Sequence, residues 1–181
     1  MPIQVQVGPR FFVFIATSVD GYIAGSEGDL DWLSCVDKAG EDYGFAAFME
    51  RIDTLLLGRN TYDAVLGMKA WPYAGKSCFV VTHRPVEASR YGVEFVSGST
   101  DAIVAALRQA EAQSVYVDGG QLIQQWLDAG LVDEITISIV PVLLGQGIRL
   151  FPGGFRNQAL KLTRCLQHET GLVQLTYEKE R

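Results

Sequence analysis

The chain has 181 residues, which is enough for one domain of ordinary size and leaves little for a second. Hydrophobic residues make up 48% of it, which excludes an intrinsically disordered chain, and the net charge of −6 argues against general nucleic-acid binding. The longest purely apolar run, residues 11–16, is too short to span a membrane, and the first residues show no signal-peptide pattern.

The cysteines and histidines give no sign of a metal site. Cys35, Cys78 and Cys165 are odd in number and far apart, which argues against a disulfide framework and a zinc site. The two histidines, His83 and His168, are too distant in sequence to form a helical pair of ligands. We therefore expect no metal, no membrane and no nucleic-acid partner, and a reducing, cytoplasmic location.

The pattern along the chain predicts a loose N-terminal arm over residues 1–10 and a single domain over residues 11–181. In chain order, we predict a strand at 11–16, an extended segment at 22–24, a loop at 25–34, a helix at 41–52, a strand at 54–57, a helix to about 66, strands at 77–82 and 93–96, a helix at 101–112, a strand at 114–117, a helix at 121–129, and strands at 132–140, 160–168 and 172–178. Strands that alternate with helices and are then followed by strands alone indicate an α/β domain of three layers. Its sheet should be mixed, mostly parallel, with antiparallel C-terminal strands.

Polar or glycine-containing turns lie at three predicted strand ends, each before an expected helix N-terminus. They fall at residues 58–61, 82–84 and 118–121. In an open α/β sheet, ligands bind at the carboxyl ends of strands, where helix N-termini offer free N–H groups to phosphates. One such turn is most simply a tight connection, but three in one small domain favour a nucleotide with several phosphates. The glycine signatures of ordinary dinucleotide-binding folds and of P-loops are absent, so another architecture must hold it.

Five segments in order resemble the dihydrofolate-reductase superfamily. They are residues 19–24 (VDGYIA), 57–62 (LGRNTY), 117–120 (VDGG), 131–135 (LVDEI) and 141–147 (PVLLGQG). More closely, they resemble the branch containing the reductase domain of the bifunctional riboflavin-biosynthesis deaminase/reductase and its stand-alone bacterial relatives. The resemblance covers residues 11–178. It implies a dihydrofolate-reductase-like fold with an eight-stranded sheet, NADPH as cofactor, a small-molecule substrate and a homodimer built on the C-terminal strands.

The resemblance also implies which residues contact the cofactor and the substrate. Ala16 and Ile23 match the positions that line the nicotinamide pocket, and Trp32 and Phe45 are candidate substrate contacts. The remaining cofactor-binding candidates are Gly58, Arg59, Asn60, Thr61, Thr82, His83, Arg84, Gly119, Gly120, Gln121, Leu122 and Ile123. Among these, the cations Arg84 and Arg59 suit the dianionic 2′-phosphate of NADPH. Simpler interpretations remain: His83 as an exposed loop residue, and Trp32 as part of the core.

The proton donor is the least defined part of the predicted site. Hydride transfer to a C=N bond leaves a nitrogen that needs a proton. The spacing of folate reductases places their acid at Asp42, where an apolar pocket would raise its pKa, and Asp31 beside Trp32 is the second candidate. Alternatively, Asp42 merely favours a helix N-terminus. The pair Asp20 and Gly21 is most simply a turn.

The expected function is an NADPH-dependent reductase of a small pterin- or pyrimidine-like heterocycle, of the dihydrofolate reductase or 5-amino-6-(5-phosphoribosylamino)uracil reductase type. The chain departs from both types, because residues 30–33 replace the folate-reductase loop and Lys38 is the only cation near the early loop. The alternative is a catalytically idle NADP-binding module of the same fold. A weaker third possibility is a flavin- or nucleotide-binding protein. The first two differ in their need for Asp42, Asp31 and Trp32.

Overall fold

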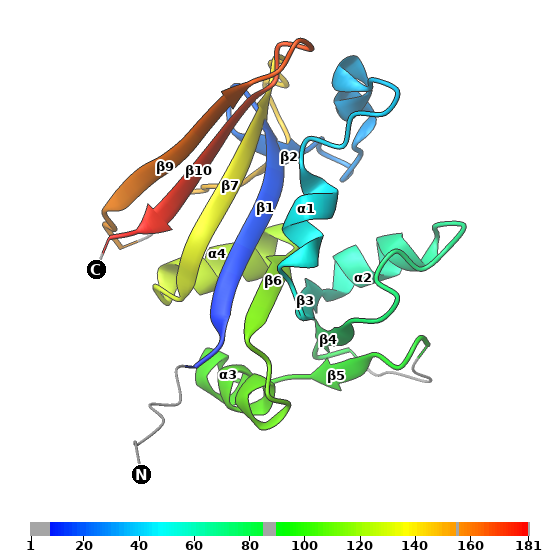
Figure 1. Cartoon of the computed structure of the whole chain (residues 1–181), viewed down its shortest axis with the longest axis vertical. Helices are drawn as coiled ribbons and strands as arrows, with labels where there is room; N and C mark the ends of the chain where they lie inside the picture. Colours follow the sequence, from blue (N-terminus) through cyan, green and yellow to red (C-terminus); the bar gives the residue numbers. More distant parts are fainter. Residues whose placement is uncertain (1–7, 85–89, 155, 181) are drawn as a thin grey trace.

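The computed structural model describes residues 8–84, 90–154 and 156–180, and its centre is an eight-stranded sheet (Figure 1). The order of the strands is β5-β4-β3-β6-β1-β7-β10-β9. Their bounds are β1 (Arg10–Ser18), β3 (Thr54–Gly58), β4 (Ser77–Val81), β5 (Glu94–Val96), β6 (Ser114–Asp118), β7 (Val132–Val140), β9 (Leu160–Gln167) and β10 (Val173–Lys179). All neighbours from β5 to β7 are parallel, whereas β10 is antiparallel to both β7 and β9. The predicted mixed, mostly parallel sheet with antiparallel C-terminal strands is confirmed.

Helices cover both faces of this sheet, so the fold has the three layers that the sequence predicts. On one face, α1 (Phe45–Glu50) and α2 (Arg59–Leu66) contribute Phe48, Tyr62 and other side chains to one core cluster. On the other face, α3 (Thr100–Gln109) and α4 (Gly120–Asp128) contribute to a second cluster around Trp126. Figure 1 shows α4 behind β7 and β1.

The inner parallel strands are continuous apolar runs because both of their faces are covered. In β3, Leu55, Leu56 and Leu57 are fully buried and alternate between the two clusters. Strand β1 does the same, with Phe11 on the α4 side and Phe12 on the α1 side. It begins at Arg10, one residue earlier than predicted, and residues 1–7 of the predicted arm lie outside the described residues.

Strand β1 lies between β6 and β7, and its two ladders have different lengths. Pairing with β6 ends at Phe12 and Tyr116, whereas pairing with β7 continues to Ser18 and Val140. The carboxyl ends of β1 and β6 therefore part from each other. This opening lies beside Asp118, the last residue of β6.

Three local features differ from the sequence-based expectation. The predicted helix at 41–52 begins only at Phe45, because Tyr43 and Gly44 have positive φ angles of 55° and 79°, which a helix does not allow. Part of the predicted loop at 25–34 belongs to a 3-10 helix, η1 (Asp31–Val36). Strand β2 (Tyr22–Ala24), predicted as extended, pairs with the two-residue β8 (Ile148–Arg149), which the sequence did not reveal.

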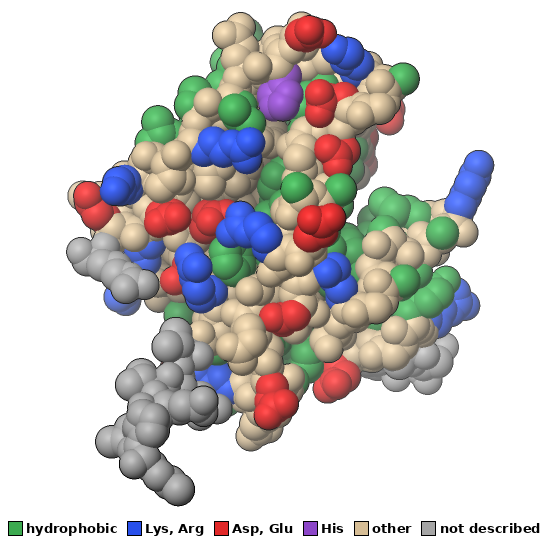
Figure 2. All heavy atoms as spheres, viewed as in Figure 1, with side chains coloured by type: hydrophobic (Ala, Val, Ile, Leu, Met, Phe, Trp, Pro, Cys, Tyr) green, Lys and Arg blue, Asp and Glu red, His purple; other side chains and the backbone are tan. Residues whose placement is uncertain are grey.

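None of the helices within the described ranges has the length and apolar character that crossing a membrane would require. Acidic and basic side chains are interspersed over the face shown in Figure 2. The same view shows that this face is hollowed between the part that carries α1 and the part that carries α2.

Candidate functional site

Two helices begin directly at the ends of neighbouring strands, and neither has a side-chain cap. Strand β3 leads into α2 at Gly58, and β6 leads into α4 at Gly119. By contrast, the Ser99 hydroxyl at the start of α3 accepts a hydrogen bond from the N–H of Ala102. The first N–H groups of α2 and α4 are therefore available to an anion, and both helix dipoles favour one.

Glycine is required where these two helix starts meet. Gly119 has a φ of +115°, and a Cβ there would lie 2.9 Å from Thr61 Oγ1 and 3.3 Å from the backbone nitrogen of Gly58. At Gly120, a Cβ would instead lie 2.5 Å from Cδ1 of Ile23, the movable end of a side chain. The close approach between the β3–α2 connection and the β6–α4 connection therefore depends on Gly119 more than on Gly120.

Charged and polar side chains from α2 and the end of β4 form one cluster at this edge. Arg59 Nε lies 2.8 Å from Asp63 Oδ1, and Arg84 Nη1 lies 3.5 Å from Asp63 Oδ2. Arg84 also donates through Nη2 to Asn60 Oδ1, and its backbone N–H donates to Thr82 Oγ1. The structure thus brings together the predicted residues Arg59, Asn60, Thr82 and Arg84, and Asp63 is the common acceptor of the two arginines.

This cluster retains a donor that the described protein atoms leave unused. Arg59 Nη1 is buried and has no hydrogen-bond partner. A buried guanidinium nitrogen without a partner is costly, and a phosphate oxygen would satisfy it. His83, predicted to lie in the same place, is exposed.

The other predicted cofactor residues lie around the β3–α2 and β6–α4 connections. Ala16 and Ile23 are half-buried at the carboxyl end of β1 and in β2, and Gln121 is exposed at the start of α4. Leu122 and Ile123 are buried in the core on the α4 side. The N–H of Ile123 already donates to Gly119 O, so this residue supports the helix and offers no free group to a ligand.

Asp118 is a site residue that sequence reasoning missed. Its carboxyl group lies on the same face as Tyr116, because the two are alternate residues of β6. Burial raises its pKa to about 6, while hydrogen bonds from the Gly119 N–H and the Tyr116 side chain act in the opposite direction. The sequence signal that could have identified it is its position directly after an apolar strand and just before Gly119. The pattern over residues 118–121 by itself predicts only a turn.

The expected raised pKa of Asp42 is wrong. Asp42 is exposed, and its carboxylate accepts hydrogen bonds from the backbone N–H groups of Ala46 and Gly44, both at 2.9 Å. These bonds lower its pKa. The simpler interpretation, that Asp42 favours the start of a helix, matches this geometry, although the helix begins three residues later.

The remaining candidates lie near the carboxyl end of β1 or on α1. Asp31 is exposed at the start of η1. Trp32 and Ala16 both pack against a small buried cluster, and Trp32 Nε1 is buried without a hydrogen-bond partner among the described residues. Phe45 contacts Phe14 edge-on, with 5.5 Å between ring centroids.

Asp20 is part of a structural turn, as predicted. Its carboxylate accepts hydrogen bonds from the Ser18 hydroxyl and from the N–H groups of Gly145 and Leu144. These bonds lower its pKa to about 2, with the Ser18 bond contributing most. Asp20 thus ties the turn after β1 to the loop after β7.

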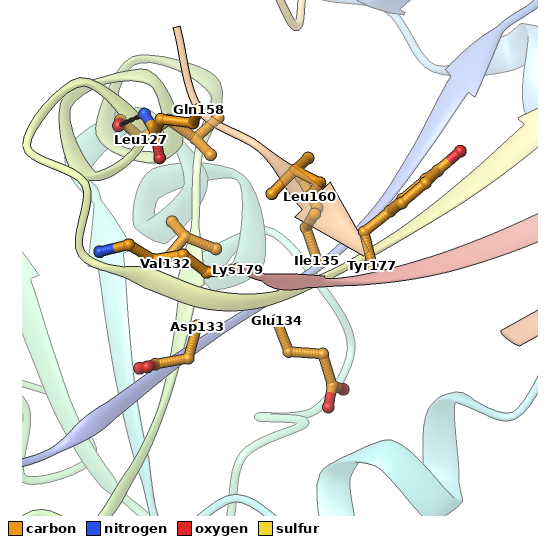
Figure 3. A pocket seen from close by; sticks show the side chains of 9 residues that line it. All are labelled: Leu127, Val132, Asp133, Glu134, Ile135, Gln158, Leu160, Tyr177 and Lys179. Atoms are coloured by element: carbon orange, nitrogen blue, oxygen red, sulfur yellow. Dashed lines mark hydrogen bonds between the residues drawn. The ribbon is translucent and has the colours of Figure 1, made fainter. Parts of the chain in front are cut away.

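A hollow at the opposite end of the sheet is separate from this site. It lies between the end of α4 and strands β7, β9 and β10, and Figure 3 shows Asp133 and Glu134 pointing away from its other lining residues. Lys179 Nζ and Gln158 Nε2 are both occupied by backbone carbonyl groups there. None of the predicted site residues lines this hollow. In the described part of the chain, no three His, Cys, Asp or Glu side chains are grouped as metal ligands.

Comparison with known proteins gives matches along nearly the whole chain. The model of the RibD C-terminal domain family matches residues 9–174. The uncharacterized protein YwjB of Bacillus subtilis (strain 168) is 36% identical over 167 residues, which are 91% of this chain and 95% of that protein. A crystal structure from Shewanella sp. PV-4, provisionally assigned to riboflavin biosynthesis, is 39% identical with a TM-score of 0.88, covering 95% of this chain and 99% of that one. A dihydrofolate reductase from Enterococcus faecalis, solved with NADP(H), has the same fold at 20% identity and a TM-score of 0.68, covering 95% and 97% of the two chains.

Proposed function

The chain belongs to the RibD C-terminal domain family, and on that premise we propose that it is an NADPH-dependent reductase of a small pyrimidine- or pterin-like heterocycle. One observation carries the cofactor part of the proposal. Two uncapped helix N-termini converge at Gly58 and Gly119, next to the guanidinium groups of Arg59 and Arg84. This combination fits a dinucleotide with a diphosphate and one further phosphate.

Each part of the site has a distinct role in this proposal. The N–H groups that begin α2 and α4 bind the diphosphate, with Asn60, Thr61 and Gln121 beside them. Arg59 and Arg84 bind the 2′-phosphate, and the unused Nη1 of Arg59 supports this assignment. Thr82 orients the backbone N–H of Arg84. Ala16 and Ile23, near the opening between β1 and β6, line the nicotinamide pocket.

Asp118 replaces Asp42 as the proposed proton donor. NADPH, when bound, supplies the hydride. A carboxyl group whose pKa is about 6 holds a proton in a substantial fraction of molecules near neutral pH, and the low pKa of Asp42 does not allow this. Tyr116, two residues before Asp118 on the same face of β6, is in ring contact with Phe45 and Phe48, so the surface beside Asp118 is apolar. Asp118 then delivers its proton to the substrate atom made basic by reduction.

The cofactor assignment is tested by titrating the protein with NADPH and NADH in a calorimeter. A charged hydrogen bond contributes on the order of 1.5–3 kcal/mol, so NADPH should bind about tenfold more tightly or better. Arg84→Ala should remove most of this preference and leave NADH binding nearly unchanged. Arg164→Ala, an exposed position on β9, is the matched control. Equal affinities of the native protein for the two cofactors would contradict the proposal.

The reductase assignment is tested separately with NADPH oxidation. Dihydrofolate and the riboflavin-pathway pyrimidine are the first substrates to assay. Oxidation of NADPH in the presence of either one would support the assignment as a reductase. Binding of NADPH without its oxidation in the presence of any substrate would favour the idle module.

The proposal also includes a homodimer built on the C-terminal strands and a location in the cytoplasm. The exposed side chains of Leu160 and Leu162 support the dimer, and three unpaired cysteines agree with a reducing compartment.

A further inference from the structure

Asp63 connects the two arginines that are proposed to bind the 2′-phosphate of NADPH. Its carboxylate is shared between them, because Oδ1 accepts a hydrogen bond from Arg59 Nε at 2.8 Å and Oδ2 lies 3.5 Å from Arg84 Nη1. The first contact has the length of a charged hydrogen bond, whereas the second is longer than an ordinary one. Asp63 is therefore bound firmly to Arg59 and only weakly to Arg84.

The order of these charges along α2 is not the one that stabilises a helix. Arg59 is the first residue of α2, where the helix dipole is positive, and Asp63 follows it by four residues. An ion pair of this spacing stabilises a helix best when the acid precedes the base. Arg84, just after β4, adds a second cation at the same place. The start of α2 thus gathers positive charge, as a site for an anion requires, and Asp63 balances part of it.

The two arginines differ in what they still offer to an anion. The Arg59 side chain is 24% exposed, and its Nη1 is buried without a hydrogen-bond partner among the described residues. A phosphate that binds this nitrogen leaves the bond between Nε and Asp63 in place. The Arg84 side chain is 57% exposed, and two acceptors already occupy its terminal nitrogens, Asn60 at Nη2 and Asp63 at Nη1. At Arg84, a phosphate therefore competes with the negative charge of Asp63.

We propose that Asp63 is an internal counter-ion that competes with the 2′-phosphate of NADPH and so limits the affinity for this cofactor. In the free protein, its carboxylate neutralises part of the charge of Arg59 and Arg84. When the cofactor binds, the dianionic phosphate takes over Arg84, and Asp63 keeps only Arg59. The repulsion between carboxylate and phosphate then lowers the affinity, which favours release of the oxidised cofactor after turnover. This inference rests on the proposed cofactor site.

The test is Asp63→Asn, which removes the charge and keeps an oxygen that accepts a hydrogen bond from Arg59. In calorimetric titrations, the dissociation constant of NADPH should be roughly fivefold lower than that of the native protein, the size expected for removing one like-charge contact in a largely solvated site. The affinity for NADH, which lacks the 2′-phosphate, should change less. Asp128→Asn, at an exposed acid that ends α4, is the matched control and should change neither affinity.

Two further measurements distinguish competition from a role in holding the arginines in place. The two cations and one anion of this group sum to a charge of +1, which becomes +2 in Asp63→Asn. The dissociation constant of NADPH should therefore rise more steeply with salt concentration in the variant. In an Arg84→Ala background, the gain from Asp63→Asn should be smaller, because the group for which the carboxylate competes is gone.

The outcomes separate this inference from the proposed function. Unchanged or weaker NADPH binding in Asp63→Asn, with the native preference for NADPH intact, would overturn the inference and leave the cofactor assignment standing. An unchanged salt dependence, or an equal gain with and without Arg84, would also overturn it. Equal affinities of the native protein for NADPH and NADH would instead contradict the proposed cofactor site, and the inference with it.

Discussion

The proposed proton donor, Asp118 at the end of β6, leads us to expect a particular pH dependence of the reaction. A carboxyl group with a pKa of about 6 loses its proton above that pH, so kcat should fall roughly tenfold per unit from there. Asp118→Asn should lower kcat by about 10² or more and remove this dependence. The measurement is the steady-state rate of NADPH oxidation from pH 5 to 8.

Asp42→Asn and Asp31→Asn are the matched controls for this experiment. Both residues are exposed, and both variants should retain a rate within a few-fold of the native one. A large loss at Asp42 alone would restore the folate-reductase-like assignment. A large loss at Asp31 alone would place the acid in the loop that carries Trp32.

The two glycines at the start of α4 should respond differently to substitution. Gly119→Ala puts a side chain on a backbone with φ of +115° and brings its Cβ within 3.3 Å of the Gly58 nitrogen, so we expect a loss of at least about 1 kcal/mol in stability and a loss of NADPH binding. Gly120→Ala meets only the end of the Ile23 side chain, which can rotate away. Urea unfolding and calorimetry check both variants. Equal effects at the two positions would argue against the helix corner at Gly119 as the diphosphate site.

At the scale of the elements, the turn after β1 depends on one carboxylate. The folded-state pKa of Asp20, about 2, lies below its ordinary value of 3.8, so the ionised group stabilises the fold above about pH 4. This contribution is lost as the pH falls from 4 toward 2. Asp20→Asn should therefore lower the melting temperature at neutral pH, and the difference from the native protein should shrink to near zero at pH 2. A difference in melting temperature that persists at pH 2 would show that the stabilising effect of the Asp20 hydrogen bonds does not depend on its charge.

Elements with a strong internal pattern could be predicted from the sequence, and elements fixed by distant contacts could not. Strand β3 is a run of three leucines before a glycine, and its bounds follow from that pattern. Strand β8 has two residues and exists only because β2 lies beside it, 124 or more residues earlier. The start of α1 was misplaced because the positive φ of Tyr43 is held by contacts with the hairpin between β9 and β10, including its hydroxyl bond to Thr170.

The residues of the candidate site also differ in how well the local sequence predicts them. Gly58, Arg59 and Gly119 could be predicted, because they are turn residues that directly follow apolar strands. The role proposed for Asp118 depends on the separation of β1 from β6 and on the aromatic side chain of α1 that contacts its neighbour Tyr116, and no local pattern contains either.

At the scale of the whole molecule, the outer C-terminal strands leave apolar side chains in solvent. Leu160 and Leu162 on the edge strand β9 are 44% and 49% exposed. Such an edge is usually covered, and we expect a second copy of the chain to cover it. Light scattering at micromolar concentration should give the mass of a dimer, and Leu162→Glu should give a monomer. Met68→Glu, at a residue 58% exposed on the far side of the sheet, should remain dimeric. A monomeric native protein would contradict this prediction.

The central place of β1 has a consequence for the order of events during synthesis. Strand β1 is translated before its two partners, β6 and β7, whose residues follow about a hundred positions later. Until those strands are translated, the apolar segment of β1 has no partners, and most of its native contacts are remote in sequence. Folding of such a topology is slow, and the unpaired strand is prone to aggregate. The apolar segment of β1 is therefore most vulnerable before residue 140 has emerged, and a chaperone that shields this segment would improve the yield of folded protein.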